Sequence, residues 1–390
     1  AVGCEALEAN TTENNNTAIG HKAFHACTTQ SEATAVGAFA GQAVTTGDQN
    51  TLMGYNAGGS ITTGGSNIAM GAYALDACVS GSHNTAIGNA SLSAATGEYN
   101  TAVGSATMQT TSTGDRSTAC GYGALYDNTT GSQNTALGMS ALENNTTASY
   151  NTGVGYNVLS NNTTGQYLTA VGHSALGANT TGEQNTAMGY EAASSCSTTN
   201  YHTCIGFRAG RDISTGEGNT YIGHHAGLQT TESSHNVAIG RNALTLGTDG
   251  IQQNVAIGYA CLYSNTNGDY NVAIGSHAGN AVTSGSHNVY VGRHAGYVST
   301  TGAQNVAVGQ VAGAAITTGH QNTLIGDNAG TAVTTSNNNT CVGHYAGGVV
   351  TTGANNLLLG VSAGTSSAPS GAVTTGSNIA CLGNNSISDL

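Results

Sequence analysis

A 17-residue repeat constrains this chain more than any other feature. Asn-Thr-Ala-Ile-Gly at residues 84–88 returns as Asn-Thr-Ala-Val-Gly at residues 100–104, and variants of it run through all 390 residues. The glycine that closes each copy, called the marker glycine below, recurs with a step of 17 almost everywhere. Exceptions are a step of 16 (Gly88 to Gly104), one of 18 (Gly240 to Gly258) and one of 23 (Gly360 to Gly383). This periodicity predicts a single repeat domain over residues 1–390.

A unit of 17 residues is too short for a helix pair or a propeller blade, but it suits one coil of a β-solenoid. Thr-Ala-Ile reads as a short strand, and Thr-Thr-Gly, as at residues 45–47, reads as a turn whose glycine accepts positive φ. The sequence therefore predicts an all-β fold, a parallel β-solenoid or β-roll of about 23 coils. At one strand spacing per coil, such a stack would be roughly 110 Å long.

The step of 23 predicts an irregular insertion at residues 365–376, Thr-Ser-Ser-Ala-Pro-Ser-Gly-Ala-Val-Thr-Thr-Gly. Pro369 cannot donate a ladder hydrogen bond, so we expect it in an exposed, mobile excursion. Val373 should return to the core.

An asparagine stands four residues before the marker glycine in most coils. In-register stacking would join these side chains in an amide ladder, which is a structural role. Members of this predicted ladder are Asn50, Asn67, Asn84, Asn134, Asn185, Asn236, Asn271, Asn305 and Asn322.

Two positions after the marker glycine share the task of filling the core. In six coils the fourth residue is leucine and the seventh asparagine, as in Leu125 and Asn128. In seven others the fourth is glycine and the seventh is Val or Ile, as in Gly41 and Val44. We expect one core slot that is reachable from both positions. The coils of Gly223 and Gly292 lack this pattern, and there Leu228 and Val298 would take the slot.

Neither face of the predicted strand is polar. The residue before the marker glycine is always Ile, Val, Leu, Met or Cys, and the residue two before it is usually Ala. A strand that is apolar on both faces is normally covered on both. We expect the Ile/Val face to point into the coil and the alanines to meet other copies of the chain. The simplest assembly is a homotrimer about a shared axis.

Composition excludes several partners. The net charge is −13, with six Lys and Arg in total, which disfavours nucleic acid and anionic membranes. No apolar run is long enough to span a bilayer. The nine cysteines fall in scattered columns without a Cys-x-x-Cys pair, which favours small buried hydrophobes over a disulfide framework.

No catalytic or metal-binding constellation emerges, and no cofactor is expected. Ser362 matches the Gly-x-Ser-x-Gly elbow of hydrolases but occupies a freely varied slot of the repeat. Histidines fall at expected turn positions. His83, His235 and His287 share one column, and His277 and His294 share another, roughly 5 Å apart. No carboxylate or cysteine recurs beside the His277–His294 pair, so solvated histidines are the preferred interpretation.

Two surface features bear on partners. Most Asn-x-Thr sequons lie in the outer Asn-Asn-Thr-Thr-Gly turn and would be glycosylated only in a eukaryotic source. The sequons begin at Asn10, Asn15, Asn128, Asn144, Asn145, Asn161, Asn162, Asn179 and Asn338. Tyrosines such as Tyr55, Tyr122 and Tyr156 directly follow marker glycines and, if exposed, could stack on host-surface glycans, although scattered surface tyrosines are the simpler interpretation.

The motifs "NTAIGxxAL" and "NVAIGxxAG" resemble the repeat of trimeric autotransporter adhesin heads of the YadA type, in nearly every coil. The resemblance implies a left-handed parallel β-roll that assembles as a trimer, although those heads use shorter coils. The 17-residue form with Thr-Thr-Gly turns also looks like tail-fibre repeats of marine phages. The segment "LGNNSISDL" (382–390) resembles the lead into the chaperone domain of such fibres.

These observations favour a structural or adhesive fibre over an enzyme. The first hypothesis is the shaft of a phage or viral tail fibre involved in host attachment, on the virion surface or otherwise extracellular. The alternative is a cell-surface adhesin head or a glycosylated extracellular filament. A remote alternative is an ice-binding solenoid, because threonines stack in ladders.

Overall fold

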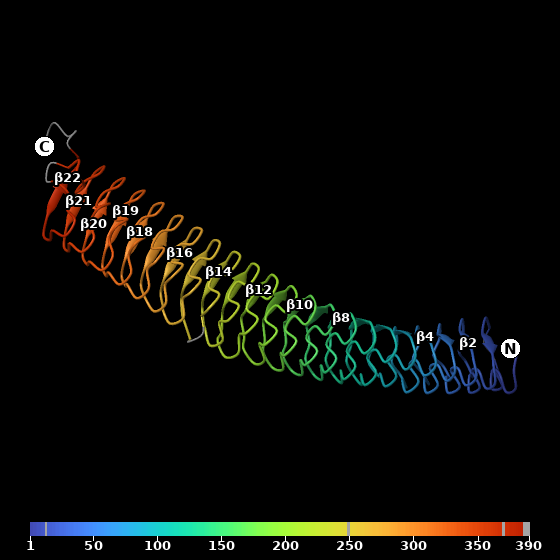
Figure 1. Ribbon diagram of the computed structural model, residues 1–390. Coiled ribbons are helices and arrows are strands. Elements are labelled where there is room, and N and C mark those ends of the chain that lie inside the picture. Colours follow the sequence, from blue (N-terminus) through green and yellow to red (C-terminus); the bar gives the residue numbers. More distant parts are fainter. Residues whose placement is uncertain (12–13, 248–249, 369–370, 385–390) are drawn as a thin grey trace. The chain divides into compact units, whose positions relative to one another are not determined.

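The computed structural model describes residues 1–11, 14–247, 250–368 and 371–384. It confirms a parallel β-solenoid with coils of about 17 residues, and no helix occurs within these ranges. The chain forms two compact units, Ala1–Thr198 and Thr199–Leu390. Each unit is a stack of similar coils with one three-residue strand per coil (Figure 1).

The strands fall at the predicted Thr-Ala-Ile positions. Those of the first unit are β1 (Thr17–Ile19), β2 (Thr34–Val36), β3 (Thr51–Met53), β4 (Ile68–Met70), β5 (Thr85–Ile87), β6 (Thr101–Val103), β7 (Thr118–Cys120), β8 (Thr135–Leu137), β9 (Thr152–Val154), β10 (Thr169–Val171) and β11 (Thr186–Met188). Those of the second are β12 (Thr203–Ile205), β13 (Thr220–Ile222), β14 (Val237–Ile239), β15 (Val255–Ile257), β16 (Val272–Ile274), β17 (Val289–Val291), β18 (Val306–Val308), β19 (Thr323–Ile325), β20 (Thr340–Val342), β21 (Leu357–Leu359) and β22 (Ala380–Leu382). The first copy of the motif makes only a bridge, from Val2 to Ile19.

Register is strict within each unit. Each strand pairs in parallel with the next, so that equivalent residues face each other, as Thr85 faces Thr101 and Ala86 faces Ala102. Backbone bonds continue through the turns: the Gly58 N–H donates to Ala74 O (2.8 Å) and the Thr45 N–H to Thr62 O (2.9 Å). Equivalent atoms therefore form columns along the stack.

The marker glycine is required by this stacking. At Gly258, φ is +133°, and a Cβ would lie 2.7 Å from the carbonyl carbon of Gly275 in the next coil. No side chain fits at that distance from a backbone. Non-glycine residues also adopt positive φ at the second and fourth positions after the marker, as Ser140 (54°) and Leu142 (53°) do. No local propensity in the sequence indicates this left-handed pair.

The alanine column, two residues before the marker glycine, points into each coil. Ala86, Ala102 and Ala136 have no exposed surface, whereas Ile19 is 45% and Met188 is 41% exposed. The prediction that the Ile/Val face points inward is therefore wrong. The physical reason is the limited interior volume of the coil. Leucine or valine from the turn already fills it, so the strand contributes a small residue.

The prediction that two positions share the core slot is confirmed. Leu125 and Leu142 from the fourth position are fully buried, and so are Val44 and Ile61 from the seventh. Leu7, in the first coil, is only half-buried.

Tyrosines fill the two coils that break the pattern. Tyr221 and Tyr290, in the alanine column, are fully buried, and the Tyr290 hydroxyl donates to Ser299 Oγ (2.9 Å). Leu228 and Val298 are only half-buried, so the prediction that they take the slot is wrong. The alanine column can supply the large residue itself.

Glycines flank every large residue of the alanine column. A Cβ on Gly41 would lie 2.7 Å from Leu52 of the next coil, and one on Gly58 would lie 2.8 Å from Leu52 of its own coil. The same flanking pairs recur elsewhere: Gly210 and Gly227 for Tyr221, Gly279 and Gly296 for Tyr290, Gly313 and Gly330 for Leu324, and Gly347 and Gly364 for Leu358. These flanking glycines make room for one large side chain over two coils.

The C-terminal end of the insertion rejoins the stack of coils, as predicted for Val373. Val373 is buried, and the Thr351 N–H donates to Thr374 O (2.8 Å) across a step of 23 residues. Pro369 and residues 385–390 lie outside the described residues.

Candidate functional site

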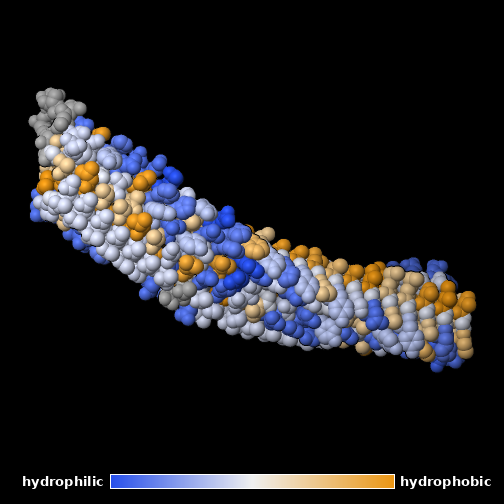
Figure 2. Space-filling model, viewed as in Figure 1, coloured by the Kyte–Doolittle hydropathy of each residue, from blue (hydrophilic) through white to orange (hydrophobic). Residues whose placement is uncertain are grey.

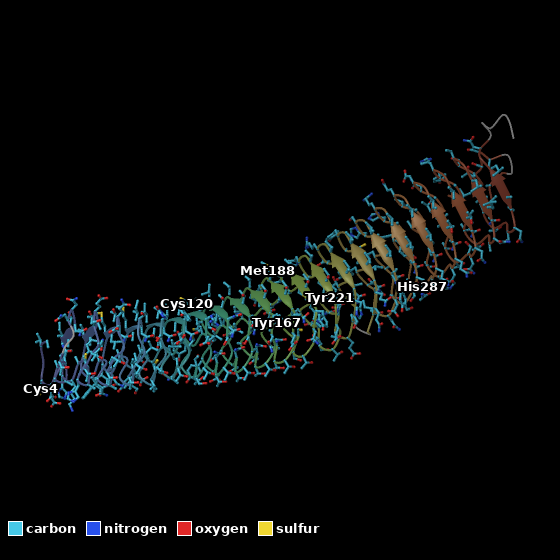
Figure 3. The ribbon with its side chains drawn as sticks, turned by 180° about the vertical axis from the view of Figure 1, so that it is seen from behind. Cys4, Cys120, Tyr167, Met188, Tyr221 and His287 are labelled. Carbon is cyan, nitrogen blue, oxygen red and sulfur yellow. The ribbon has the colours of Figure 1, made fainter. Side chains whose placement is uncertain are left out.

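The outer face of the strands is the most extensive surface feature of each unit. It carries two columns: the outer aliphatic column, directly before the marker glycine, and the outer Thr/Val column, three residues before it. Exposed members of the aliphatic column include Met53, Met70, Ile87, Leu137, Met188, Ile274 and Ile325, each 37–41% exposed. Figure 3 looks onto this side, with Met188 at one edge of the strands, and Figure 2 shows apolar side chains along the edge of the coils near β8 and β10.

This face is regular and uncovered within each unit, and its aliphatic column is apolar. Because Ile, Val, Leu or Met stands at the end of every strand except β7, which ends in Cys120, this apolar stripe is continuous rather than scattered. Contiguous apolar patches of this kind mark interaction surfaces in proteins. Its chemistry is hydrophobic contact, and it offers no group for catalysis.

The asparagine column lies inside the coil and forms hydrogen-bonded ladders. Asn50 Oδ1 accepts from the Asn67 N–H (3.0 Å), and Asn50 Nδ2 donates to Gly64 O (2.9 Å). In the second unit the side chains also join directly, as Asn305 Nδ2 donates to Asn288 Oδ1 (3.2 Å). All nine predicted members are buried, so their role is structural.

A second asparagine ladder occupies the sequon positions of the first unit. Asn128, Asn145, Asn162 and Asn179 are fully buried, and Asn145 Nδ2 donates to Asn128 Oδ1 (2.8 Å). The prediction that these sequons lie in an outer turn is wrong, because the seventh position turns inward. A glycan cannot be attached there in the folded coil. Asn10, in the first coil, is half-buried.

His202 replaces an asparagine of the ladder and is buried, so the prediction that all histidines lie in turns is wrong. Its Nδ1 accepts from the Asn219 N–H (3.3 Å), which places the proton on Nε2, and Nε2 lies 3.0 Å from Gly216 O. Burial lowers its pKa to about 4. The sequence signal was available: residue 202 stands four before marker Gly206.

Exposed rings stack on one another along the turns. Tyr150 and Tyr167 stack at 5.2 Å between ring centroids, and His83 and Tyr99 stack at 4.9 Å. Stacked rings present their edges outward, which weakens the interpretation of these tyrosines as a flat sugar platform. His277 and His294 lie 5.2 Å apart, near the expected spacing, with rings at 70°.

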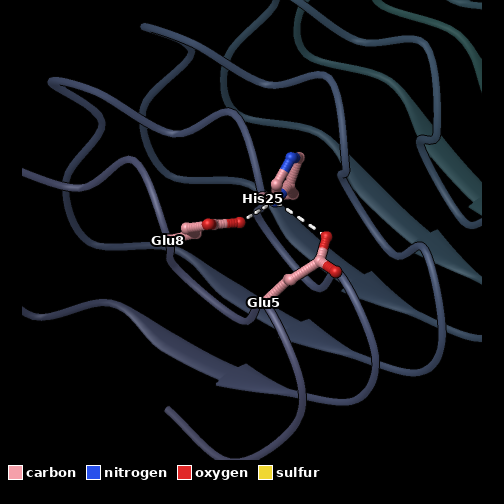
Figure 4. A group of neighbouring side chains, drawn as sticks. All are labelled: Glu5, Glu8 and His25. Atoms are coloured by element: carbon pink, nitrogen blue, oxygen red, sulfur yellow. Dashed lines mark ion pairs between the residues drawn. The ribbon is translucent and has the colours of Figure 1, made fainter.

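One group of three metal-ligand side chains occurs among the described residues: Glu5, Glu8 and His25 (Figure 4). His25 Nδ1 lies 3.1 Å from a Glu8 oxygen and 3.9 Å from a Glu5 oxygen. Lys22 Nζ lies 3.3 Å from the same Glu5 oxygen. Lys22 already supplies a positive charge beside the carboxylates, so the group reads as a surface polar cluster.

No disulfide is assigned among the described residues, and most of the cysteines are buried. Cys27, Cys78 and Cys196 occupy the core slot, and Cys204, Cys341 and Cys381 the alanine column. Burial raises the pKa of Cys78 to about 11 and that of Cys341 to about 12. Cys4 and Cys120 are exposed.

Comparison with known proteins does not assign the chain to a family. No protein-family model matches the chain, and no curated protein matches it. Within the described ranges no helix is long and apolar enough to cross a membrane.

Proposed function

We propose that this chain is a self-associating structural and adhesive fibre segment, most simply the shaft of a phage or viral tail fibre that takes part in host attachment. The observation that carries the proposal is the continuous apolar outer face of each unit. A monomer would leave this stripe in water, whereas association of copies through it would bury it. The resemblance to YadA-type heads and marine phage fibres favours a homotrimer on a virion or cell surface.

The ladders support a load-bearing role over an enzymatic one. Buried amides and backbone bonds join each coil to the next, and the repeat offers no unique set of acids, bases and nucleophiles. The runner-up is a cell-surface adhesin head or extracellular filament. Its glycosylated form would have to use exposed sequons such as Asn15, Asn161 and Asn338, because Asn128, Asn145, Asn162 and Asn179 are buried.

Ice binding is favoured by one observation, namely that the outer Thr/Val column is not covered within the chain. Thr85 and Thr101, for example, pair in register on the outer face. Thermal hysteresis of the purified chain tests this reading, and its absence removes it.

Light scattering combined with circular dichroism tests the fibre proposal. Met53→Glu/Met70→Glu/Ile87→Glu places carboxylates on the outer face and should give a folded monomer where the wild type forms a multimer. Thr46→Glu/Thr63→Glu/Ser80→Glu is the matched control, since these turn residues are exposed and Glu232 occupies the same column. The control should assemble normally.

Ala102→Glu/Ala136→Glu/Ala187→Glu should instead unfold the coils, because it buries three unpaired charges. A folded, monodisperse wild-type monomer would refute self-association.

A further inference from the structure

An acidic chain carries one basic edge. It lies in the second unit and is formed by the first and second residues after the marker glycine in six successive coils, from Gly206 to Gly292. Three of the six Lys and Arg residues of the whole chain stand there: Arg208, Arg241 and Arg293. The histidines of the same positions are His224, His225, His277 and His294. Within the six coils these positions hold no Asp or Glu, and one coil earlier Glu191 stands in the column of Arg208.

The side chains of this basic edge interact. His224 and His225 lie 3.9 Å apart between ring centroids, and Phe207 stacks on His224 at 5.1 Å. The Arg208 guanidinium lies 5.1 Å from the centre of the Phe207 ring, and that of Arg241 lies 5.8 Å from the Tyr259 ring. Figure 2 shows strongly hydrophilic side chains gathered over the coils of β12 to β14.

The mutual effect of these charges is visible in the histidines. Burial lowers the pKa of His225, and so does the positive charge of four neighbours, His224, Arg208, Arg211 and Arg241. Burial, Arg293 and His277 lower the pKa of His294 in the same way. Asp212 forms a two-pronged ion pair with Arg211, at 2.7 Å for each contact, and lies outside the first and second positions. The charge of the arginines does not depend on the protonation of His225 and His294.

We propose that the basic edge binds an acidic polysaccharide whose chain runs along the stack of coils. Guanidinium groups bind carboxylate or sulfate through paired hydrogen bonds. Arg208 and Arg241 stand two coils apart and Arg241 and Arg293 three, or about 10 and about 14 Å. This spacing suits a polymer with one charge every few sugars. Phe207 and Tyr259, each about two-fifths exposed, add apolar ring edges between the charges.

Nucleic acid fits this edge less well. Its charges stand about 3.4 Å apart along each strand, far denser than three arginines over six coils. The inference rests on the proposed adhesive function and gives it a ligand class and a location.

The test measures binding of the full chain to immobilised hyaluronan, a polysaccharide with one carboxylate per disaccharide, at low salt. Neutral dextran and single-stranded DNA serve as comparison ligands. The variant Arg208→Asn/Arg241→Gln/Arg293→Gln uses residues that these columns already hold, as in Asn242 and Gln310. Arg116→Gln, in the first unit, is the matched control.

We expect hyaluronan binding to weaken at least tenfold in the triple variant and to stay unchanged in Arg116→Gln. Equal binding by the triple variant, equal binding to dextran, tighter binding to DNA or no binding to hyaluronan would each overturn the proposal. Light scattering on the same samples reports self-association separately, so failure of the edge and failure of the fibre can be told apart.

Discussion

At the scale of single residues, His202 is the clearest case of a side chain whose chemistry differs from that of its column. Its Nδ1 accepts from a backbone N–H, so a second proton on the ring would face a donor inside the coil. Protonation therefore costs both desolvation and a hydrogen bond.

This arrangement predicts a loss of stability in acid. The pKa of His202 falls from an ordinary 6.5 to about 4, so the unfolded chain binds a proton more readily. Stability should be unaffected above pH 6.5 and decrease by about 3 kcal/mol as the pH falls to 4. Denaturant unfolding of the wild type and of His202→Asn, which restores the ladder residue, should show this difference only below pH 6.5. Parallel pH curves would contradict it.

A second residue-scale prediction concerns the thiols. Cys4 and Cys120 are exposed, whereas the other seven are buried. A water-soluble disulfide reagent should label two thiols in the native protein and nine after denaturation. Cys120→Ser should remove one label from the native protein and leave the number of buried thiols at seven. Rapid labelling of Cys78 or Cys341 in the native protein would contradict the prediction, because it would mean that the coils open.

At the scale of the coil, core volume is shared between the strand and the turns next to it. Leu52 and Gly58 belong to the same coil. Leu52 leaves no space for the leucine that other coils have at the position of Gly58, where a Cβ would already lie 2.8 Å from Leu52. This is a packing constraint between the strand and the following turn.

A double-mutant cycle tests this constraint. Leu52→Ala should cost about 2–5 kcal/mol through the cavity it leaves. Gly58→Leu alone should lower the stability further. Its Cβ would lie 2.8 Å from Leu52, and the core has no space for the rest of the new side chain. The double variant should be more stable than Gly58→Leu alone, since it shortens one of the two side chains, Leu52 and Ile61, that a Cβ on Gly58 would meet. Strictly additive losses in denaturant unfolding would refute the coupling.

The sequence predicted the strands well and their orientation badly, for physical reasons. Spacing fixes where Thr-Ala-Ile recurs, but alternation along a strand is the same whichever face points inward. The choice depends on how much of the interior the turns fill. Likewise, the inward course of Asn145 depends on left-handed residues such as Leu142, which no local propensity announces. The glycine flanks of Leu52, by contrast, were readable as covariation between columns.

At the scale of the whole molecule, coils should be exchangeable only where their cores match. Deleting residues 139–155 removes one coil from a run of leucine coils and joins Gly138 to Tyr156, which leaves Leu159 beside Ala136. Deleting residues 55–71 also removes 17 residues but brings Leu75 to the place of Gly58, beside Leu52. The first deletion should lower the melting temperature by a few degrees at most, and the second should lower it clearly more. Equal effects of the two deletions would show that the flanking glycines do not set coil compatibility.

The flanking glycines also bear on how such a gene can change its copy number. Near-identical repeats invite unequal crossing-over, which adds or removes whole coils at the junction of two misaligned copies. A junction between two leucine coils leaves the core packing unchanged. A junction that separates Leu52 from Gly41 or Gly58 places a larger residue beside Leu52 and overpacks the core. Selection would then tolerate length variation inside the leucine runs and resist it around each large alanine-column residue. The number of coils should therefore vary only in the segments between the five large residues of the alanine column, which are Leu52, Tyr221, Tyr290, Leu324 and Leu358.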